Sequence, residues 1–464
     1  MKTSSPVLFF RKIQRSSSLF YNTIHSLVTA VLSVLLSLAT SVLVARGLGP
    51  AAKGGVDIIF ATTNLLVMIF GFSLTSGIVY VIAQGRSAAR KLIVQLTILS
   101  FVQSLLSGVF LILVLQSDVS SEIIPKDIQE WSVFAVILLV FLNLVNNYYY
   151  SIFVGFQDFP KVNRCGILVK IASFLIMFSF FVLSGLGVWE FNEIVVIWVS
   201  VISSVFSIFL LRYFVVPLLN HGIESKGRSG IREILFYSIP AYMANVVQYL
   251  SYRLDIFIVG FFMDLRGVGL YALSVNISQS IWLFSGTISN VFYPNVASTT
   301  DKNLINHRTA RVARLTLFLN VILCFILAFV GANFLPFIFG EDFRESILPL
   351  LWLLPGVAIF GVTNVISSYV VGMGKPGLTF WFAIVCLVVT VFLDISLIPL
   401  WGIEGAAIAS STAYIAASLF SILVFVQETG INPLRLVLPE KDDFAVVVRF
   451  FYGRNFTRPH QDLF

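Results

Sequence analysis

The chain has 464 residues, of which 58% are hydrophobic and only 11% are charged, with a mean hydropathy of +0.94 and a formal net charge of +7. This composition excludes an ordinary soluble protein, because too few polar residues are present to cover a core of that size. The apolar runs are long enough for membrane-spanning α-helices, which excludes an outer-membrane barrel of short alternating strands.

Twelve spans are predicted when charge clusters and Gly or Pro punctuation are taken as loops. The first span follows a basic segment with Lys2, Arg11 and Lys12, and its apolar run is too long for the core of a cleaved signal peptide. We therefore expect a retained first helix. The predicted spans are 20–45, 56–83, 91–115, 131–154, 163–185, 191–211, 234–262, 268–297, 311–334, 346–371, 377–399 and 404–427.

Basic and acidic residues separate into alternate connections between these spans. Arg86 and Arg90 lie in one connection, for example, and Asp118 and Glu122 lie in the next. Since Lys and Arg remain on the cytoplasmic side, the pattern predicts a multi-pass protein with both termini in the cytoplasm. Topology accounts for the positive net charge, and nucleic-acid binding is not needed to explain it.

The two halves of the chain repeat one another at an offset of about 214 residues. LVARGLGPAAKGGVDIIF (43–60) matches FIVGFFMDLRGVGLYALS (257–274), so that Gly55 pairs with Gly269. An even number of spans in each half predicts an axis along the membrane normal, and transporters built this way bind substrate between the halves. The expected domains are an N-terminal six-helix lobe (1–219), a cytoplasmic inter-lobe connection (220–233), a C-terminal six-helix lobe (234–427) and a cytoplasmic tail (428–464).

The sequence carries no strong enzyme motif. It has neither a Walker-type loop nor a Gly-x-Ser-x-Gly elbow, its four His show no zinc spacing, and GMGKPG (372–377) departs from the Walker pattern. We therefore expect a protein that is not an enzyme, with no catalytic residue, no metal and no cofactor. Without a nucleotide site, transport must run downhill or use a gradient, of protons or of sodium.

Ionisable residues at membrane depth are the most informative feature. Arg253 and Asp255 lie well inside the seventh span, Lys170 lies about two turns into the fifth, and Arg46 ends the first. A charge in hydrocarbon costs about 2.5–3.5 kcal/mol, and it persists where it faces a cavity or a partner. Arg253 could instead neutralise an acid, and Lys170 could snorkel towards the cytoplasm. A cavity with more bases than acids favours an anionic passenger, because guanidinium binds phosphate oxygens in a bidentate fork.

Polar stripes follow several spans. Asn245, Tyr249 and Arg253 share one face of the seventh span, with Gln248 beside them. Such stripes line a hydrated cavity or bond neighbouring helices, and the sequence leaves both possibilities open. Two further stripes are Asn143, Asn146, Asn147 and Tyr150 on the fourth span, and Ser26, Thr29, Ser33, Ser37 and Thr40 on the first.

Four segments carry a family resemblance through their order and spacing. They are LVARGLGPAAKGG (43–55), LPFIFGEDFRESILPLLWL (335–353), VGMGKPGLTF (371–380) and IPLWGIEGAAIASSTAYIAASL (398–419). Over nearly the whole chain, the sequence resembles the polysaccharide transporter branch of the multidrug/oligosaccharidyl-lipid/polysaccharide exporter (MOP) superfamily. That branch includes the flippases of O-antigen (lipopolysaccharide) and capsule repeat units.

The resemblance implies an all-α, MATE-like fold, with two six-helix lobes forming a V around a central cavity. It implies an oligosaccharide on undecaprenyl pyrophosphate as passenger, moved from the inner to the outer leaflet of the bacterial cytoplasmic membrane by alternating access. Polysaccharide polymerase and glycosyltransferases are the implied protein partners. The implied cavity residues are Arg46, Lys170 and Arg253 for the headgroup, with Asp255 beside them, and Asn143, Asn147, Asn245 and Gln248 for the sugars.

The sequence leaves other functions open. A cation-coupled multidrug or metabolite exporter of the same superfamily would use Asp255 as its proton or sodium site. A membrane enzyme such as a sugar polymerase is disfavoured by the short outer loops, and a structural or assembly role is the remaining alternative. Neighbouring genes for glycosyltransferases would favour the flippase.

Overall fold

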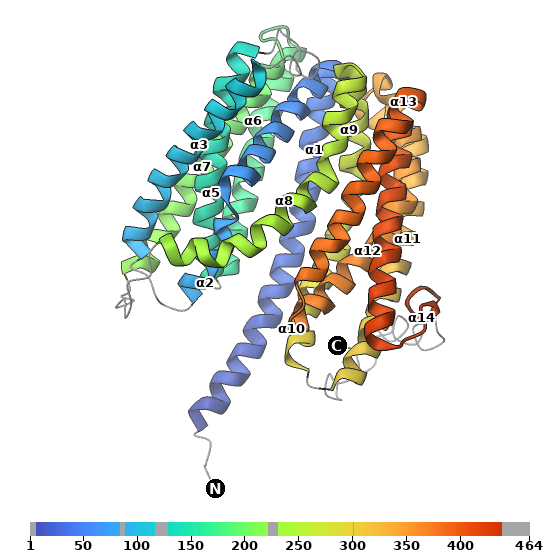
Figure 1. The fold of residues 1–464 in the computed structure, drawn as a ribbon. Helices are drawn as coiled ribbons and strands as arrows, with labels where there is room; N and C mark the ends of the chain where they lie inside the picture. The colour runs from blue at the N-terminus through green and yellow to red at the C-terminus, as the bar shows by residue number, and fades with distance from the viewer. Residues whose placement is uncertain are drawn as a thin grey trace. The chain divides into compact units, whose positions relative to one another are not determined.

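Helices and the short turns between them make up the residues that a computed structural model describes, namely 6–83, 89–116, 129–156, 158–220, 231–299 and 301–438 (Figure 1). This confirms the all-α prediction. Most of the predicted inter-lobe connection and the last 26 residues of the predicted tail lie outside these ranges. The helices are α1 (Pro6–Gly71), α2 (Leu74–Ala83), α3 (Ala89–Leu115), α5 (Gln129–Gly155), α6 (Phe159–Gly185), α7 (Glu193–Asn220), α8 (Ile231–Phe262), α9 (Leu265–Gln279), α10 (Trp282–Ser298), α11 (Lys302–Phe339), the 3-10 helix η2 (Glu341–Ser346), α12 (Ile347–Gly372), α13 (Gly377–Thr429) and α14 (Leu434–Val437).

Every predicted span coincides with helix in this structure. Eight of the described helices are long and apolar enough to cross a membrane by length and composition. α13 holds two predicted spans, and α1 holds the first predicted span and part of the second. Each of these helices is broken at one glycine, Gly49 (φ 73°) in α1 and Gly402 (φ 56°) in α13. Glycine adopts positive φ at little cost. A break at one glycine therefore replaces each of the two predicted loops.

Two predicted spans are interrupted, which the sequence did not predict. The span 56–83 breaks between α1 and α2, where Phe72 and Ser73 have φ of 48°. The span 268–297 breaks between α9 and α10. Both are the second span of their predicted half, so the interruptions are consistent with the predicted duplication.

The chain divides into two compact units. The first unit contains Met1–Leu48 and Thr62–Tyr242, and the second contains Gly49–Ala61 and Met243–Phe464. The Gly49 break therefore marks the point where α1 passes from one unit to the other. The domain boundaries predicted from the repeat stay a prediction.

Each unit has its own packing. In the first unit, α5 contacts α2, α3 and α7, and α6 packs against α7. In the second, α12 contacts α9, α10, α11 and α13 around a core that includes Phe292, Ile366 and Phe425. α12 is thus the central helix of the second unit, and α5 holds a similar place in the first.

Large apolar side chains also cover the outside of the molecule. Phe325, Phe337 and Phe392 expose 70–77% of their surface. A soluble protein rarely exposes so many large apolar groups, whereas hydrocarbon surrounds them without cost. The exposed aromatic and aliphatic surface therefore supports a multi-pass membrane protein.

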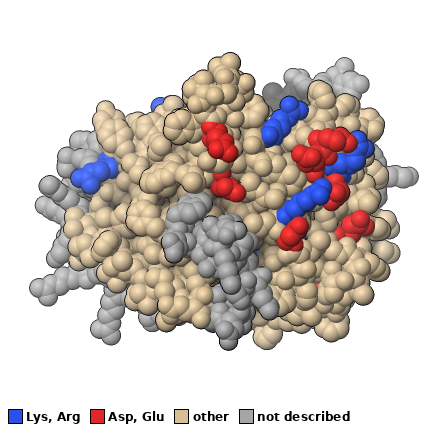
Figure 2. Space-filling view, turned by 90° about the horizontal axis from the view of Figure 1, so that it is seen from above, with Lys and Arg blue, Asp and Glu red and all other residues tan. Residues whose placement is uncertain are grey.

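Charged side chains at the helix ends are mixed in sign. Figure 2 shows acids and bases next to one another on the face that it views, with no extended patch of one sign. In the second unit, Arg266 Nη2 lies 2.9 Å from Glu345 Oε1, and Arg344 pairs with Glu341. These exposed bases are matched by acids, which makes them suitable controls for the bases at membrane depth.

The two glycines Gly54 and Gly269 bring α1 and α9 into backbone contact within the second unit. A Cβ on Gly54 would lie 1.8 Å from the carbonyl oxygen of Leu265, and a Cβ on Gly269 would lie 2.0 Å from that of Pro50. The contact is reciprocal, because each glycine lies against the carbonyl oxygen that is one helical turn before the other glycine. Only a residue without a side chain allows this approach.

Replacing Gly54 or Gly269 with alanine should separate α1 from α9 and lower the free energy of unfolding by about 1–3 kcal/mol or more, because backbone atoms cannot yield as a flexible side chain can. Thermal unfolding in detergent micelles would measure the loss. Gly166→Ala in α6 is the matched control, because a Cβ there meets no atom within 4 Å. That control should be neutral or slightly stabilising, and a similar loss in it would contradict the interpretation.

Candidate functional site

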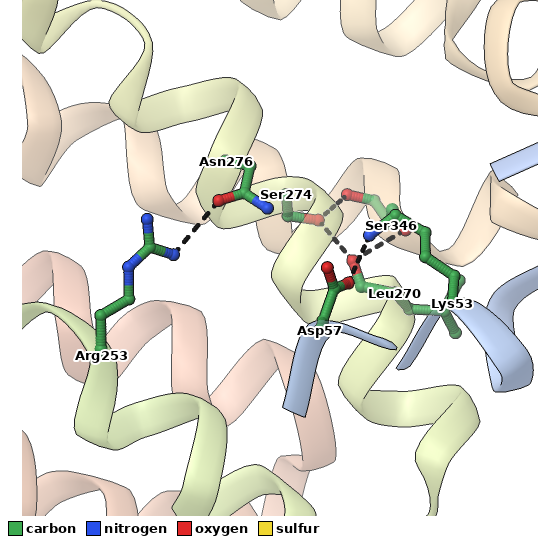
Figure 3. Close-up of polar contacts among 7 residues, drawn as sticks. All are labelled: Lys53, Asp57, Arg253, Leu270, Ser274, Asn276 and Ser346. Atoms are coloured by element: carbon green, nitrogen blue, oxygen red, sulfur yellow. Dashed lines mark hydrogen bonds and ion pairs between the residues drawn. The ribbon is translucent and has the colours of Figure 1, made fainter. Parts of the chain in front are cut away.

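Arg253 lies on α8 and reaches a polar residue of α9 in the second unit. Its Nη1 donates a hydrogen bond to Oδ1 of Asn276 at 3.1 Å (Figure 3). Asn276 is exposed although its neighbours Val275 and Ile277 are buried. The amide thus orients the guanidinium without neutralising it, and in the described part of the chain Arg253 forms no salt bridge with a carboxylate.

The neighbouring base on α1 is arranged differently. Lys53 is buried, with 3% of its side chain exposed, and it forms an ion pair with Asp57 one turn further along (Figure 3). Ser346 of η2 donates to the carbonyl oxygen of Leu270 at 2.9 Å, and Ser274 of α9 donates to the carbonyl oxygen of Ser346 at 2.8 Å. These bonds fix α9 to η2. Because Lys53 is buried and paired, it serves packing, and Arg253 is the base of the two that is available to a ligand.

Lys170 is the candidate headgroup-binding base of the first unit. Its Nζ donates to the hydroxyl of Ser37 at 2.7 Å and to the carbonyl oxygen of Ser33 at 3.2 Å, which joins α6 to α1. The serine stripe predicted on the first span therefore includes the partners of Lys170. Both partners are neutral oxygens, and no ion pair to this lysine occurs among the described residues.

Asp255 lies inside the second unit and not on the exposed side that carries Arg253. It is 1% exposed, and its Oδ2 accepts hydrogen bonds from the hydroxyls of Tyr271 (2.6 Å) and Ser410 (3.2 Å). Its Oδ1 accepts from the backbone N–H of Ile256 at 2.8 Å. Arg253 and Asp255 therefore form no salt bridge, because residues two apart on a helix do not face each other. The guanidinium still interacts electrostatically with the buried carboxyl group.

Asp394 of α13 is the functional candidate that the sequence interpretation missed. It is fully buried, and both carboxyl oxygens have no hydrogen-bond partner in the described part of the chain. Its charge interacts with that of Asp255, so the two acids lie near one another. The rule that selected Arg253, an ionisable residue within an apolar run, would have found Asp394 in VFLDISLIP.

The remaining predicted residues are divided between the two units. Arg46 is exposed on α1, three residues before the Gly49 break, and Asn143 and Asn147 line a groove of the first unit. Asn245 and Gln248 lie on α8 in the second unit, where Gln248 Nε2 donates to the hydroxyl of Tyr252 at 3.1 Å. As residues of one common cavity, these positions remain predictions.

The arrangement is suited to binding and not to covalent chemistry. Arg253 and Lys170 offer N–H groups whose present acceptors are neutral. A guanidinium binds phosphate or carboxylate oxygens more strongly than neutral ones. Within the described residues, no group of three or more His, Cys, Asp or Glu could hold a metal ion. Asp255 and Asp394 are two buried acids of the second unit that interact electrostatically with each other.

Comparison with solved structures shows the fold. The lipid II flippase MurJ in an inward closed conformation matches with a TM-score of 0.70 at 17% identity, covering 95% of this chain and 94% of that one. The inward-facing conformation of a multidrug resistance MATE family transporter of the MOP superfamily matches with a TM-score of 0.65 at 16% identity, covering 88% and 98%. At these identities the likeness establishes the MATE and MurJ fold alone.

Sequence comparison reaches part of the chain. The protein named Probable low-salt glycan biosynthesis flippase Agl15, from Haloferax volcanii, is 22% identical over 199 residues, which are 42% of this chain and 42% of that protein. The chain spans less than half the length of the curated relatives it matches, between 42% and 46%. The family described as Polysaccharide biosynthesis protein matches residues 43–348, about two thirds of the chain, and the protein therefore belongs to that family.

Proposed function

We propose that this protein is a flippase that carries a lipid-linked oligosaccharide from the inner to the outer leaflet of the membrane. Membership of the polysaccharide biosynthesis family, the MurJ-like fold and the name given to Agl15 support the proposal. The carrier that we propose is undecaprenyl pyrophosphate in the bacterial cytoplasmic membrane, with a polymerase and glycosyltransferases as functional partners.

The observation that carries this proposal is that Arg253 and Lys170, which both lie within predicted spans, have neutral hydrogen-bond partners. A base in hydrocarbon is costly unless a cavity, water or a counter-charge compensates it. Some exposed bases of the same protein, such as Arg266 and Arg344, are paired with acids. A passenger with a pyrophosphate group would supply a counter-charge to a base such as Lys170, and a closer one to Arg253, whose guanidinium interacts with Asp255 without forming a salt bridge.

Reconstituted vesicles can test the proposal directly. The full chain should move a fluorescent polyprenyl pyrophosphate oligosaccharide between leaflets, and protein-free vesicles should not. A polyprenyl glycoside with the same sugars but no phosphate is the control, and it should move much more slowly because it cannot bind the bases. Equal movement of both lipids would contradict a phosphate-binding function.

The pair formed by Asp255 and Asp394 is the observation that favours the alternative, a cation-coupled exporter. Two buried acids require a proton or a cation, whichever passenger is carried. A flippase with an ion gradient and an exporter with an ion gradient would share this site and differ in the passenger. The control lipid without phosphate distinguishes these two functions, because positively charged side chains do not attract a cationic drug.

A further inference from the structure

A polar groove of the first unit is lined by residues of α5, α6 and α7, which pack together. Its volume is about 270 Å³, near the lower end of the range of about 300–1,000 Å³ that is usual for small-molecule sites. The stretches of α5 and α7 that form it belong to apolar helices long enough to cross a membrane. Its polar walls include Asn143, Asn146, Asn147 and Tyr150 from α5, and Ser204 and Ser207 from α7.

Hydrogen bonds in this groove are incomplete. Asn146 Nδ2 donates to the carbonyl oxygens of Leu142 (3.0 Å) and Ser204 (3.2 Å), which ties α5 to α7, while its buried Oδ1 has no partner among the described residues. In the same part of the chain, the side chains of Asn143 and Asn147 form no hydrogen bond. Polar groups at membrane depth are satisfied by protein, by water or by a ligand, so the groove is built to hold a polar occupant.

The chemistry of the lining selects the class of occupant. Amide and hydroxyl side chains both donate and accept hydrogen bonds, and the lining of the groove contains no acid and no base. A hydrocarbon chain would satisfy none of these groups, and an anionic headgroup would need a cation. Sugar hydroxyls match them, because each one also donates and accepts. Tyr150 is 51% exposed and offers an aromatic face beside the polar groups.

We infer that this groove binds neutral sugar units of the passenger. The inference rests on the proposed function and extends it, since it adds a sugar subsite to the headgroup site. Asn146 and Ser204 hold the two walls together, so the expected ligand contacts come from Asn143, Asn147 and Ser207.

Cysteine protection tests the groove without requiring transport. The three native cysteines, Cys165, Cys324 and Cys386, are all buried, so the background reaction with maleimide should be low. In a Ser207→Cys variant of the full chain in detergent, a neutral tetrasaccharide should slow maleimide labelling at least fivefold. Ser179→Cys, at an exposed site on α6 outside the groove, should label at the same rate with and without the sugar.

Transport then separates this inference from the proposed function. Asn143→Ala/Asn147→Ala should slow movement of a carrier bearing a neutral oligosaccharide about tenfold, the loss expected for two hydrogen bonds. It should leave a carrier with a single sugar within twofold of wild type, whereas loss of Arg253 should slow both carriers. Asn333→Ala, at an exposed asparagine of α11, is the matched control.

Two results would overturn the sugar subsite: no protection of Ser207→Cys by the tetrasaccharide, or equal slowing of both carriers by the double variant. Protection together with no lipid movement by the wild type would instead retain the sugar groove and remove the flippase function. A failure of the subsite is thus distinguishable from a failure of the proposed function.

Discussion

Replacing Arg253 with alanine should reduce the initial rate of lipid-linked oligosaccharide movement about 10- to 150-fold while leaving the protein folded. Charge-assisted hydrogen bonds contribute about 1.5–3 kcal/mol each, and 1.4 kcal/mol corresponds to a factor of ten. Arg253 is half-buried and its described hydrogen bond is to Asn276, so its removal leaves no carboxylate without a salt-bridge partner. The measurement is fluorescence quenching of a labelled carrier in vesicles of matched protein content.

Variants around Arg253 distinguish its charge from its geometry. Arg253→Lys keeps the charge and loses the planar fork, so we expect a rate between those of wild type and alanine. Asn276→Ala removes the amide that orients the guanidinium, which should weaken transport less than Arg253→Ala does. Arg266→Ala is the control, because Arg266 is exposed and paired with Glu345. A wild-type rate in Arg253→Ala would remove this residue from the site.

Most of the fold could be predicted from the sequence, because the length of each apolar run is set by the membrane. All twelve predicted spans fall on helices, and two of them are interrupted. The connections could not be predicted equally well. The segments around Gly49 and Gly402 have the composition of short loops, yet each is a one-residue break in a long helix. A glycine in a loop and a glycine in a helix break have the same local signal.

The candidate site could be predicted in its residue types but not in its pairings. The position of a charge within a predicted span identified Arg253, Asp255 and Lys170. The free-energy cost of placing a charge in hydrocarbon can be applied to a sequence without its tertiary structure. The partner of Arg253 was missed, since nothing in the sequence distinguishes Asn276 from other polar residues of its span. Asp394 was missed although the same rule applies to it. Packing between helices decides which of these residues contact one another, and the periodicity of a single helix does not reveal that packing.

Replacing Asp394 with asparagine should abolish the response of transport to an ion gradient without destabilising the protein. Asp394 is fully buried, and neither carboxyl oxygen has a hydrogen-bond donor among the described residues. A carboxylate in this environment requires a proton or a cation, whereas an amide of the same shape requires neither. Wild-type vesicles should respond to an imposed proton or sodium gradient, and the variant should show the same rate in either direction of the gradient.

The comparison with Asp255 shows why the two acids should behave differently. Asp255 accepts hydrogen bonds from Tyr271 and Ser410, so an asparagine there would place an amide N–H against these hydroxyls or leave one of them without its acceptor. Asp255→Asn should therefore lower the unfolding temperature, while Asp394→Asn should maintain or raise it. The exposed Asp342→Asn in η2 is the control for both measurements. A full gradient response in Asp394→Asn would show that the coupling ion binds elsewhere, and lost transport in every gradient together with a lower unfolding temperature would assign Asp394 a structural role.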